Sequence, residues 1–272
     1  MARPPNEPNP SDGPLELFAT EHRRYRKRSG LTQAALADQL NYTPQFVGMI
    51  EVAERTPSRQ YVDGADRILN ADGGLINCWL LLTRLHIPKW FGPFMDVEAQ
   101  ATAMHEWEWA FIPGLLQTAA YATALIKAGR PHISDEKVEH EVDVRMHRQE
   151  LLHRPAPPML WTVIDEYAFR RVVGGPGVMR AQLDHLLKMA ELPNVVVQIL
   201  PFDAGPHPGQ IGAFKILELD DQPGVVWVEG PDEGHFIDRE DQVAECIRRY
   251  DHLRAMALSP AASRKMITAP LE

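Results

Sequence analysis

Residues 31–59 read LTQAALADQLNYTPQFVGMIEVAERTPSR, and this stretch decides the fold of the first part of the chain. Thr32 is a good N-cap residue for a helix that carries Leu36 and Leu40 on one side, the spacing of a buried stripe. Asn41 follows, and it is one of the few residues that tolerate the left-handed backbone of a tight turn between helices. The pattern therefore predicts a short helix that ends in a tight turn.

A second short helix is predicted directly after this turn. Thr43 can cap it, and Pro44 stands at the first helical position, where a missing N–H costs nothing. Val47 and Ile50 supply its inward face. Two helices with this spacing, turn and capping are typical of the helix-turn-helix motif, whose second helix lies in the major groove of DNA. Any helical hairpin with good caps would look the same, so the pattern alone leaves DNA binding open.

The stretch as a whole resembles the phage-repressor-like, or XRE-type, helix-turn-helix domain. The residues that carry the resemblance are Leu31-Thr32-Gln33, Ala37, Thr43 to Val47, Glu51 and Thr56-Pro57-Ser58. The resemblance implies DNA binding by an all-α, lambda-repressor-like domain of five helices over residues 15–85. His22 lies on the inward stripe of the first of these helices, where relatives usually carry Leu. We interpret it as a histidine at the edge of the core, with a pH sensor or a ligand as the alternative.

Matching to this family places three side chains of the second helix toward the groove: Gln45, Phe46 and Met49. Only Gln45 can make a bidentate contact, and adenine is the base that suits it. Phe46 and Met49 could touch thymine methyl groups, whereas Gly48 reads nothing. Direct readout by one such helix is expected to be weak. Specificity would then need a dimer, DNA shape or a partner protein.

Other side chains are expected to hold DNA phosphates, which set the register of the protein on DNA but carry no sequence information. They are Gln33, Thr43, Arg55, Arg59, Arg24 and Arg28. The last two belong to a cluster of five Lys and Arg within residues 23–28. A solvated helix face is the ordinary interpretation of such a cluster. Next to a helix-turn-helix, we expect it to neutralise phosphates.

The net charge of the whole chain, -9, argues at first against nucleic acid as a partner. The charge is unevenly divided, however. Residues 1–83 carry 9 Lys or Arg and 10 Asp or Glu, a net of -1, and residues 84–272 carry the remaining 19 and 27, a net of -8. Salt screens charges beyond about 8 Å under physiological conditions. A local basic patch can therefore bind DNA even on an acidic protein.

The composition is typical of a soluble globular protein with room for two domains: 44% of residues are hydrophobic, 24% are charged, and the mean hydropathy is -0.28. No apolar run approaches the roughly 20 residues that span a membrane. The N-terminal residues lack the apolar core of a secretory signal. Cys78 and Cys246 show no metal-ligand spacing. We expect a cytoplasmic, nucleoid-associated protein without disulfides, metals or cofactors.

The rest of the chain is predicted to contain a second domain. Residues 1–14, rich in Pro and Asn, are expected to be a disordered arm, and residues 86–97 a packed linker of Pro and aromatic residues. Residues 98–272 are predicted to form an α+β domain with a four- to five-stranded sheet packed with helices. The first segment of this domain, 98–109, is predicted to be helical. The β-rich runs are Met159–Ile164, Val195–Leu200, Gly212–Leu219 and Val225–Glu229.

This second domain resembles a domain of unknown function, described as antitoxin-like, that many actinobacterial XRE-type regulators carry. The matching motifs, in order, are Ile112 to Thr118 with Tyr121-Ala122, Val144-Arg145, Arg148-Gln149, Asp165-Glu166, Val173 to Pro176, Leu192 to Val195, Leu200 to Phe202 with Gly205 and His207, Phe214, Val228 to Gly230, and Ala257 to Pro260. The resemblance covers residues 15–267 and implies a regulator without naming its effector. Relatives are frequently encoded beside a very small protein, which implies a protein partner.

Several patterns that suggest chemistry have simpler explanations. Gly174 to Gly177 lacks the spacing of a phosphate-binding loop and is better explained as a tight entry into a helix. Asp165 and Glu166 are adjacent and therefore point in different directions, and Asp165 suits an N-cap. The eleven histidines show no metal-ligand spacing. The loop 203–210, DAGPHPGQ, could be a lid, a partner contact or a plain connection. We therefore do not expect an enzyme.

A group of aromatic residues could line an apolar ligand pocket. The members of this group are Trp107, Trp109, Phe111, Trp161 and Trp227. Ordinary core packing is the simpler interpretation, and both remain open at this point.

Taken together, these patterns predict a sequence-specific transcriptional regulator that binds double-stranded DNA. Its C-terminal domain would form a homodimer and sense a small-molecule effector or a partner. The alternative is an antitoxin-like protein whose C-terminal domain binds a small partner protein, with DNA binding for autoregulation.

Overall fold

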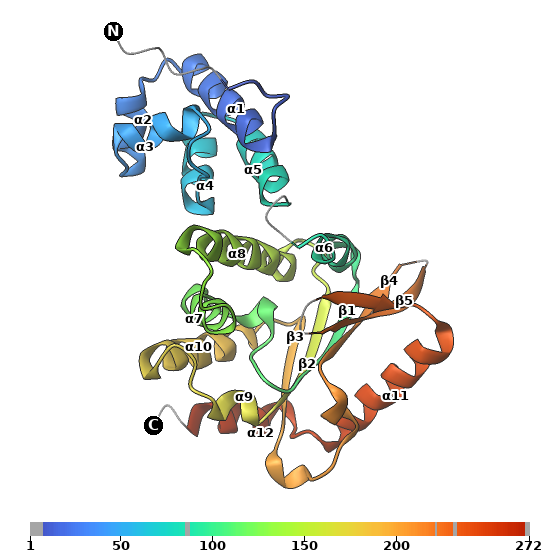
Figure 1. Ribbon diagram of the computed structural model, residues 1–272. Helices are drawn as coiled ribbons and strands as arrows, with labels where there is room; N and C mark the ends of the chain where they lie inside the picture. The colour runs from blue at the N-terminus through green and yellow to red at the C-terminus, as the bar shows by residue number, and fades with distance from the viewer. Residues whose placement is uncertain (1–7, 85–87, 221, 231–232, 270–272) are drawn as a thin grey trace. The chain divides into compact units, whose positions relative to one another are not determined.

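The computed structural model describes residues 8–84, 88–220, 222–230 and 233–269 (Figure 1). The chain forms two compact units, residues 1–87 and 88–272, and each is described by itself. The first half of the expected disordered arm and the residues 85–87 lie outside the described residues.

The described residues of the first unit form five helices, as predicted. Their bounds are α1 Pro14–Arg28, α2 Gln33–Leu40, α3 Pro44–Glu51, α4 Arg59–Ile68 and α5 Gly74–Arg84. The hydroxyls of Thr32, Thr43 and Ser58 each accept a hydrogen bond from a backbone N–H in the first turn of the following helix, and the caps at Thr32 and Thr43 are those expected from the sequence. Asn41, at φ 59°, makes the left-handed turn between α2 and α3. The local sequence therefore determines where α2, α3 and α4 begin.

The helices of the first unit share one apolar core. Its members, all buried, are Phe18, Leu36, Ala37, Val47, Ile50, Tyr61, Val62, Ala65, Leu69, Ala71, Leu75, Trp79 and Leu82. Trp79 of α5 also donates a hydrogen bond from its indole nitrogen to the carbonyl of Pro57, over 3.0 Å. Because Pro57 lies just before α4, this bond holds the segment after α3 against α5.

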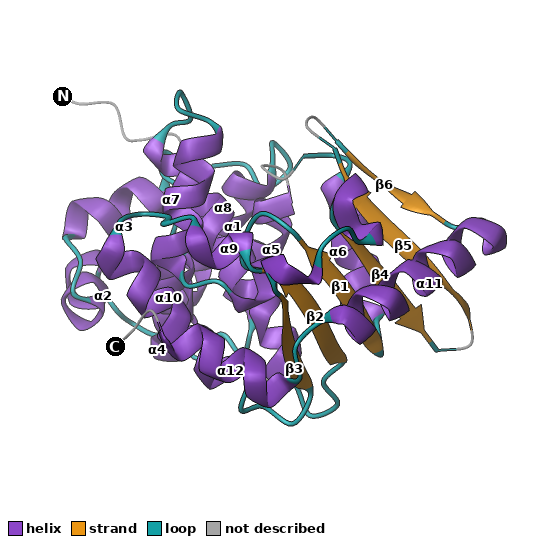
Figure 2. Ribbon diagram, turned by 90° about the horizontal axis from the view of Figure 1, so that it is seen from below, coloured by secondary structure: helices purple, strands orange, loops and turns teal. Residues whose placement is uncertain are grey.

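The second unit contains a six-stranded sheet in the order β3-β2-β1-β4-β5-β6 (Figure 2). The strands are β1 Ala103–Glu108, β2 Met159–Asp165, β3 Val195–Leu200, β4 Phe214–Leu219, β5 Gln222–Glu229 and β6 Gly234–Ile237. The pairs β1–β2 and β2–β3 are parallel, and the others are antiparallel. The predicted α+β class is confirmed, with six strands in place of four or five.

Helices cover both faces of this sheet. They are α6 Phe91–Gln100, α7 Ala119–Gly129, α8 Asp135–Arg148, α9 Tyr167–Arg170, α10 Pro176–Met189, α11 Glu240–Met256 and α12 Pro260–Thr268, with short 3-10 turns at Gly114–Leu116, Gln149–His153, Phe202–Ala204 and Pro208–Ile211. Figure 1 shows α11 on one side of the sheet and α7, α8 and α10 on the other. Two cores result, because Trp107 and Tyr250 belong to the cluster under α11, whereas Met104 and Leu183 belong to the opposite one.

One prediction for this unit was wrong in detail. Residues 103–108, predicted to be helical, form β1, and the alternation of Met104 and Glu106 with Trp107 is the period of two that a central strand requires. The second half of the predicted linker lies in α6, whose Phe94 is buried in the core. β6 was not predicted, since its four residues contain no apolar run.

No helix of the described residues combines the length and the apolar character that crossing a membrane would require.

Candidate nucleic-acid interface

The helix α3 presents one face to the core and the other to solvent. Val47 and Ile50 are fully buried, whereas Gln45 is exposed and Met49 is half-buried. The three-residue spacing of Val47 and Ile50, which packs α3 onto the domain, therefore leaves the predicted base-reading side on the outside.

A buried carboxylate attaches the end of α3 to the helices around it. Glu51 is fully buried. Its carboxylate accepts hydrogen bonds from Nε and Nη2 of Arg26 in α1, over 2.5 and 2.8 Å, and from the Gln33 amide in α2, over 2.9 Å. Burial by itself raises the pKa of this carboxyl, but bonds from Arg26, His22 and Gln33 outweigh it and lower the pKa to about 2. Glu51 therefore remains ionised and holds α3 in a fixed position against α1 and α2.

His22 completes this network from inside the core. Its ring lies with Nδ1 3.3 Å from Glu51 Oε1 and Nε2 2.9 Å from the Tyr61 hydroxyl. With a proton on Nδ1, His22 donates to Glu51 and accepts at Nε2 from Tyr61. Burial raises the pKa of the Tyr61 hydroxyl, so that it stays a neutral donor. His22 is fully buried rather than at the edge of the core, and its bonds connect α3 to α4.

The basic cluster at residues 23–28 does not form one continuous patch. Arg26 is buried on Glu51, and Arg23 donates to the Glu51 backbone carbonyl over 2.9 Å. Arg24 and Arg28 instead both contact the Tyr25 ring, and Arg28 donates to the carbonyl of Asn70. Because the five cations occupy neighbouring positions on one helix, their side chains point in several directions. Two of them are engaged by Glu51, so not all five can contact phosphates.

The other predicted phosphate contacts lie close to α3 and already have partners within the protein. Gln33 donates to Glu51, Thr43 caps α3, and Arg59 pairs with Asp63 over 2.8 Å. The guanidinium of Arg55 lies 4.6 Å above the ring of Phe46. Such contacts orient long side chains in advance and leave other N–H groups for a phosphate.

Phe46 occupies a half-buried aromatic stack beside α3. Its ring centroid is 4.6 Å from that of Tyr42 and 5.3 Å from that of Tyr61, and Arg55 covers another side. A contact with a thymine methyl group would therefore use the exposed edge of this ring. Gln45, by contrast, is exposed to solvent.

The structure does not bring together the five aromatic residues expected around one ligand pocket. Trp107 and Trp161 belong to the cluster under α11, and Trp227 packs with Phe94 in the cluster on the opposite face. Trp109 is exposed beyond the end of β1. The reason is the strand register: Trp227 pairs with Lys215, which pairs with Glu106, so it shares a face with Glu106 and not with Trp107.

The segments that suggested other chemistry have structural roles. Asp165 Oδ1 accepts the backbone N–H of Tyr167 over 2.8 Å, but the N-cap residue of α9 is Glu166, so the predicted N-cap role of Asp165 was wrong by one position. Gly174 and Gly175, at φ 70° and 88°, form the tight turn into α10. Among the described residues, no group of three or more His, Cys, Asp or Glu is placed to hold a metal ion.

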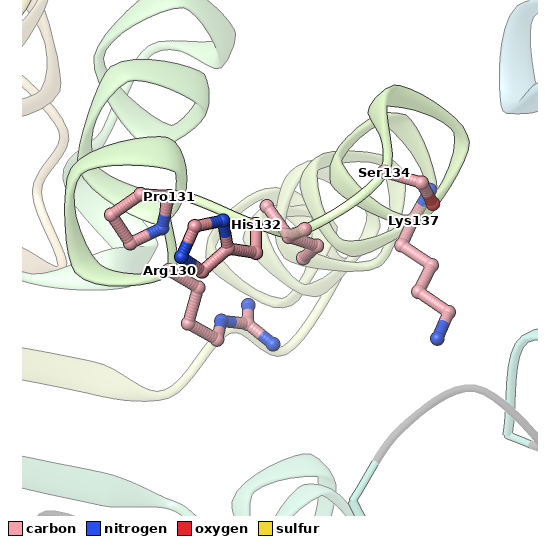
Figure 3. A pocket seen from close by; sticks show the side chains of 6 residues that line it. Arg130, Pro131, His132, Ser134 and Lys137 are labelled. Carbon is pink, nitrogen blue, oxygen red and sulfur yellow. The ribbon is translucent and has the colours of Figure 1, made fainter.

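A hollow of about 520 Å³ lies between α7 and α8 (Figure 3). It is lined by Arg130, Pro131, His132, Ile133, Ser134 and Lys137. Figure 3 shows Lys137 extending away from Arg130 and His132, so the three basic side chains do not converge on one point. Arg130 is moreover paired with Glu141.

One buried ion network was not apparent in the sequence. Glu98 of α6 is fully buried and accepts hydrogen bonds from Nε and Nη2 of Arg148 in α8, over 2.7 and 2.8 Å, and from Nζ of Lys215 in β4, over 3.2 Å. Lys215 also pairs with Glu106 Oε1, its neighbour across the β1–β4 ladder, over 3.1 Å. Burial raises the pKa of Glu98, but the two cations lower it to about 2. The network attaches α6 and α8 to the sheet. Its only signal in the sequence was the presence of charged residues, Glu106 and Lys215, among apolar strand residues.

Comparison with protein families finds a match for each unit. Residues 17–78 match a helix-turn-helix domain, and residues 91–269 match a domain of unknown function (DUF5753). Neither the curated proteins nor the solved structures contain a match to the chain. The first match spans the helices around α3, and the second spans the whole described sheet with its helices.

Proposed function

Because the chain belongs to the DUF5753 family and carries a helix-turn-helix domain ahead of that domain, we propose that it is a sequence-specific transcriptional regulator. The helix-turn-helix domain binds double-stranded DNA. The second unit dimerises the protein and senses a ligand or a partner, which changes the affinity for DNA.

The observation that carries the proposal is the position of α3. Its inner face is packed by Val47 and Ile50, its end is fixed by the Glu51 network, and its outer face presents Gln45 to solvent. A recognition helix must be rigid, because a side chain reads a base edge only when its hydrogen-bonding atoms are placed in advance.

Readout by this helix is limited to few base pairs. Of the three predicted base contacts, only Gln45 is exposed. The Phe46 ring packs against Tyr42 and Arg55. A dimer that places two such helices about 34 Å apart would double the number of bases read. The proposed regulator therefore binds DNA as a two-fold pair.

The experiment that tests this function is a fluorescence anisotropy titration of the full chain on DNA from its own upstream region. A scrambled duplex of the same composition is the control, and both are measured at two salt concentrations. We expect tighter binding to the upstream DNA and a steep loss of affinity with salt, since phosphate contacts release counterions. Equal binding to both duplexes would contradict an autonomous regulator.

The second candidate is an antitoxin-like protein whose second unit binds a small partner protein. The weak readout favours it, because specificity would then come from the complex. If the chain alone shows no preference and a small protein is encoded beside it, as it is for many relatives, adding that protein should restore preference for the upstream DNA.

A further inference from the structure

Large apolar side chains are exposed at one edge of the sheet of the second unit. In the described parts of that unit, Trp109 is 49% exposed, Val172 58%, Phe202 57% and Ile211 72%. Single exposed apolar residues are common and need no explanation, but a contiguous group marks an interaction surface.

The topology brings these residues together. Trp109 follows β1, Val172 lies in the segment after β2, and Phe202 follows β3. The three strands are parallel, so their carboxyl ends meet at the same edge. Ile211 precedes β4, which runs antiparallel to β1 and therefore starts at that edge as well. Figure 1 shows α9 and the loop after β3 together at this lower end of the sheet, and Figure 2 views the unit from that side.

Contacts between the loops place several of these residues side by side. The ring of Trp109 stacks on that of Tyr167, with centroids 6.4 Å apart. The neighbouring Glu166 accepts the backbone N–H of Phe202 over 3.0 Å, which places the loops after β2 and β3 side by side. Trp109, Tyr167, Val172, Phe202 and Ile211 are called the edge surface below.

The loops that carry the edge surface are anchored from beneath. Trp107 donates from its indole nitrogen to the carbonyl of Gly209 over 2.9 Å, two residues before Ile211. A Cβ at Gly209 would clash with the Trp107 ring, so the loop approaches as closely as only glycine permits. His207 packs edge-on against the same ring. The apolar side chains are therefore presented on loops of fixed shape, which lowers the entropy cost of binding.

The charges around the edge surface complement each other. Arg171 lies 4.8 Å above the Tyr167 ring, and Asp203 follows Phe202. Within the described residues neither side chain has an ion-pair partner. A two-fold axis brings each surface against itself, so that the cation of one copy can meet the anion of the other. A self-complementary interface needs charges of both signs beside its apolar residues, and Arg171 and Asp203 supply them next to the edge surface.

We propose that the edge surface is where two copies of this chain pair, with Phe202 and Ile211 as apolar anchors and Arg171 and Asp203 as reciprocal ion pairs. The inference rests on the proposed function, because reading two DNA half-sites is what calls for a second copy.

The test is the mass of the full chain in solution, measured by sedimentation equilibrium from roughly 1 to 100 μM. We expect a dimer for the natural chain. The double substitution Phe202→Ser and Ile211→Ser should weaken pairing roughly tenfold or more, as loss of buried anchors does. Met159→Ser with Ile247→Ser is the matched control, since these exposed apolar residues lie on the opposite edge of the sheet and on α11. The control variant should remain dimeric.

A charge exchange tests the pairing without removing apolar surface. Arg171→Asp and Asp203→Arg should each weaken the dimer, and the variant with both changes should regain it. A natural chain that is monomeric at every concentration overturns the inference, whether or not another protein occupies the surface. A dimer that is indifferent to both sets of substitutions overturns it too.

The same samples distinguish the inference from the proposed function. A dimer that responds as expected but shows no preference for upstream DNA would support the inference and contradict the proposed function. Preference for upstream DNA by a monomeric chain would overturn the inference and the dimerisation in the proposed function, but it would support sequence-specific DNA binding.

Discussion

Glu51 is the residue on which the DNA-binding unit depends most. Its carboxylate is fully buried and joins α3 to Arg26, His22 and Gln33. Breaking a buried ion pair by removing one partner is costly because the remaining charge is left without compensation. The network therefore stabilises the fold and places the recognition helix at the same time.

We predict that Glu51→Gln destabilises the protein by about 3–5 kcal/mol at neutral pH, because Arg26 stays buried without its counter-charge. Chemical unfolding of the full chain, followed by far-UV circular dichroism, measures this. The control is Glu54→Gln, three residues away on an exposed position. Equal stability of the two variants would refute the role of the network.

The same residue predicts a pH dependence. The pKa of Glu51 is lowered to about 2 in the folded chain, so its contribution is fully present above its unfolded pKa of about 4.5 and is lost as the pH falls toward 2. The difference in stability between the natural chain and Glu51→Gln should therefore shrink over this interval. Unfolding curves at a series of acidic pH values would show it, and a constant difference would contradict the low pKa.

Gln45 is the residue on which specificity is predicted to depend. Gln45→Ala should lose roughly 1–3 kcal/mol of discrimination at one base pair, since a bidentate contact disappears. Competition binding with upstream and scrambled duplexes measures the ratio of affinities. Gln242→Ala, an exposed glutamine on α11, is the control. An unchanged ratio for Gln45→Ala would mean that α3 does not lie in the groove as proposed.

At the scale of single elements, β1 is unusual because its inward face carries two carboxyls. Glu106 is buried, and one of its oxygens, Oε2, has no hydrogen-bond partner among the described residues. Glu108 follows on the same face. Burial, together with the charges of Glu106 and Glu229, raises the pKa of Glu108 well above its ordinary value. The Lys215 network stabilises β1 at Glu106. At Glu108, burial and neighbouring negative charges make an ionised carboxylate unfavourable.

We predict that Glu108→Gln stabilises the protein at about pH 8. A carboxyl whose pKa is raised on folding contributes stability in its protonated form, and that contribution falls as the pH rises from about 4.5 toward the folded pKa. Glutamine cannot ionise, so the variant should lose less stability than the natural chain on going to alkaline pH. Melting temperatures at about pH 5 and pH 8 measure the effect.

The control for this prediction is Glu139→Gln on the exposed side of α8. If the melting temperatures of the natural chain and of Glu108→Gln change equally between the two pH values, the pKa of Glu108 is not raised on folding.

At the scale of the whole molecule, DNA affinity depends on a nearly neutral unit attached to an acidic one. Residues 1–83 have a net charge of -1, whereas the whole chain has -9. The contribution of single cations near α3 should therefore be measurable against a repulsive background, most clearly at low salt.

We predict that Arg55→Ala weakens binding to all duplexes alike and lowers the slope of log affinity against log salt by about 1, as loss of one phosphate contact does. Anisotropy titrations over a series of salt concentrations measure this. A selective loss on upstream DNA would instead identify Arg55 as a base contact.

The features that could be predicted from the sequence alone were mostly those that depend on residues close together in the chain. The caps at Thr32 and Thr43 and the left-handed turn at Asn41 appear where the residues predicted them, because each depends on neighbours a few positions away. The helix-turn-helix and its domain class followed from these signals, and so did four of the six strands.

Only the tertiary structure decided the features that join distant segments. Glu51 meets Arg26 and His22 across two helices, Glu98 meets Lys215 across 117 positions, and the carboxyl ends of three parallel strands gather the edge surface. β1 was mistaken for a helix because its charged residues hide the alternation, and its neighbours in the sheet supply what its own sequence lacks. Pairing between distant segments depends on the register of strands and the packing of helices, and no local pattern of residues encodes either.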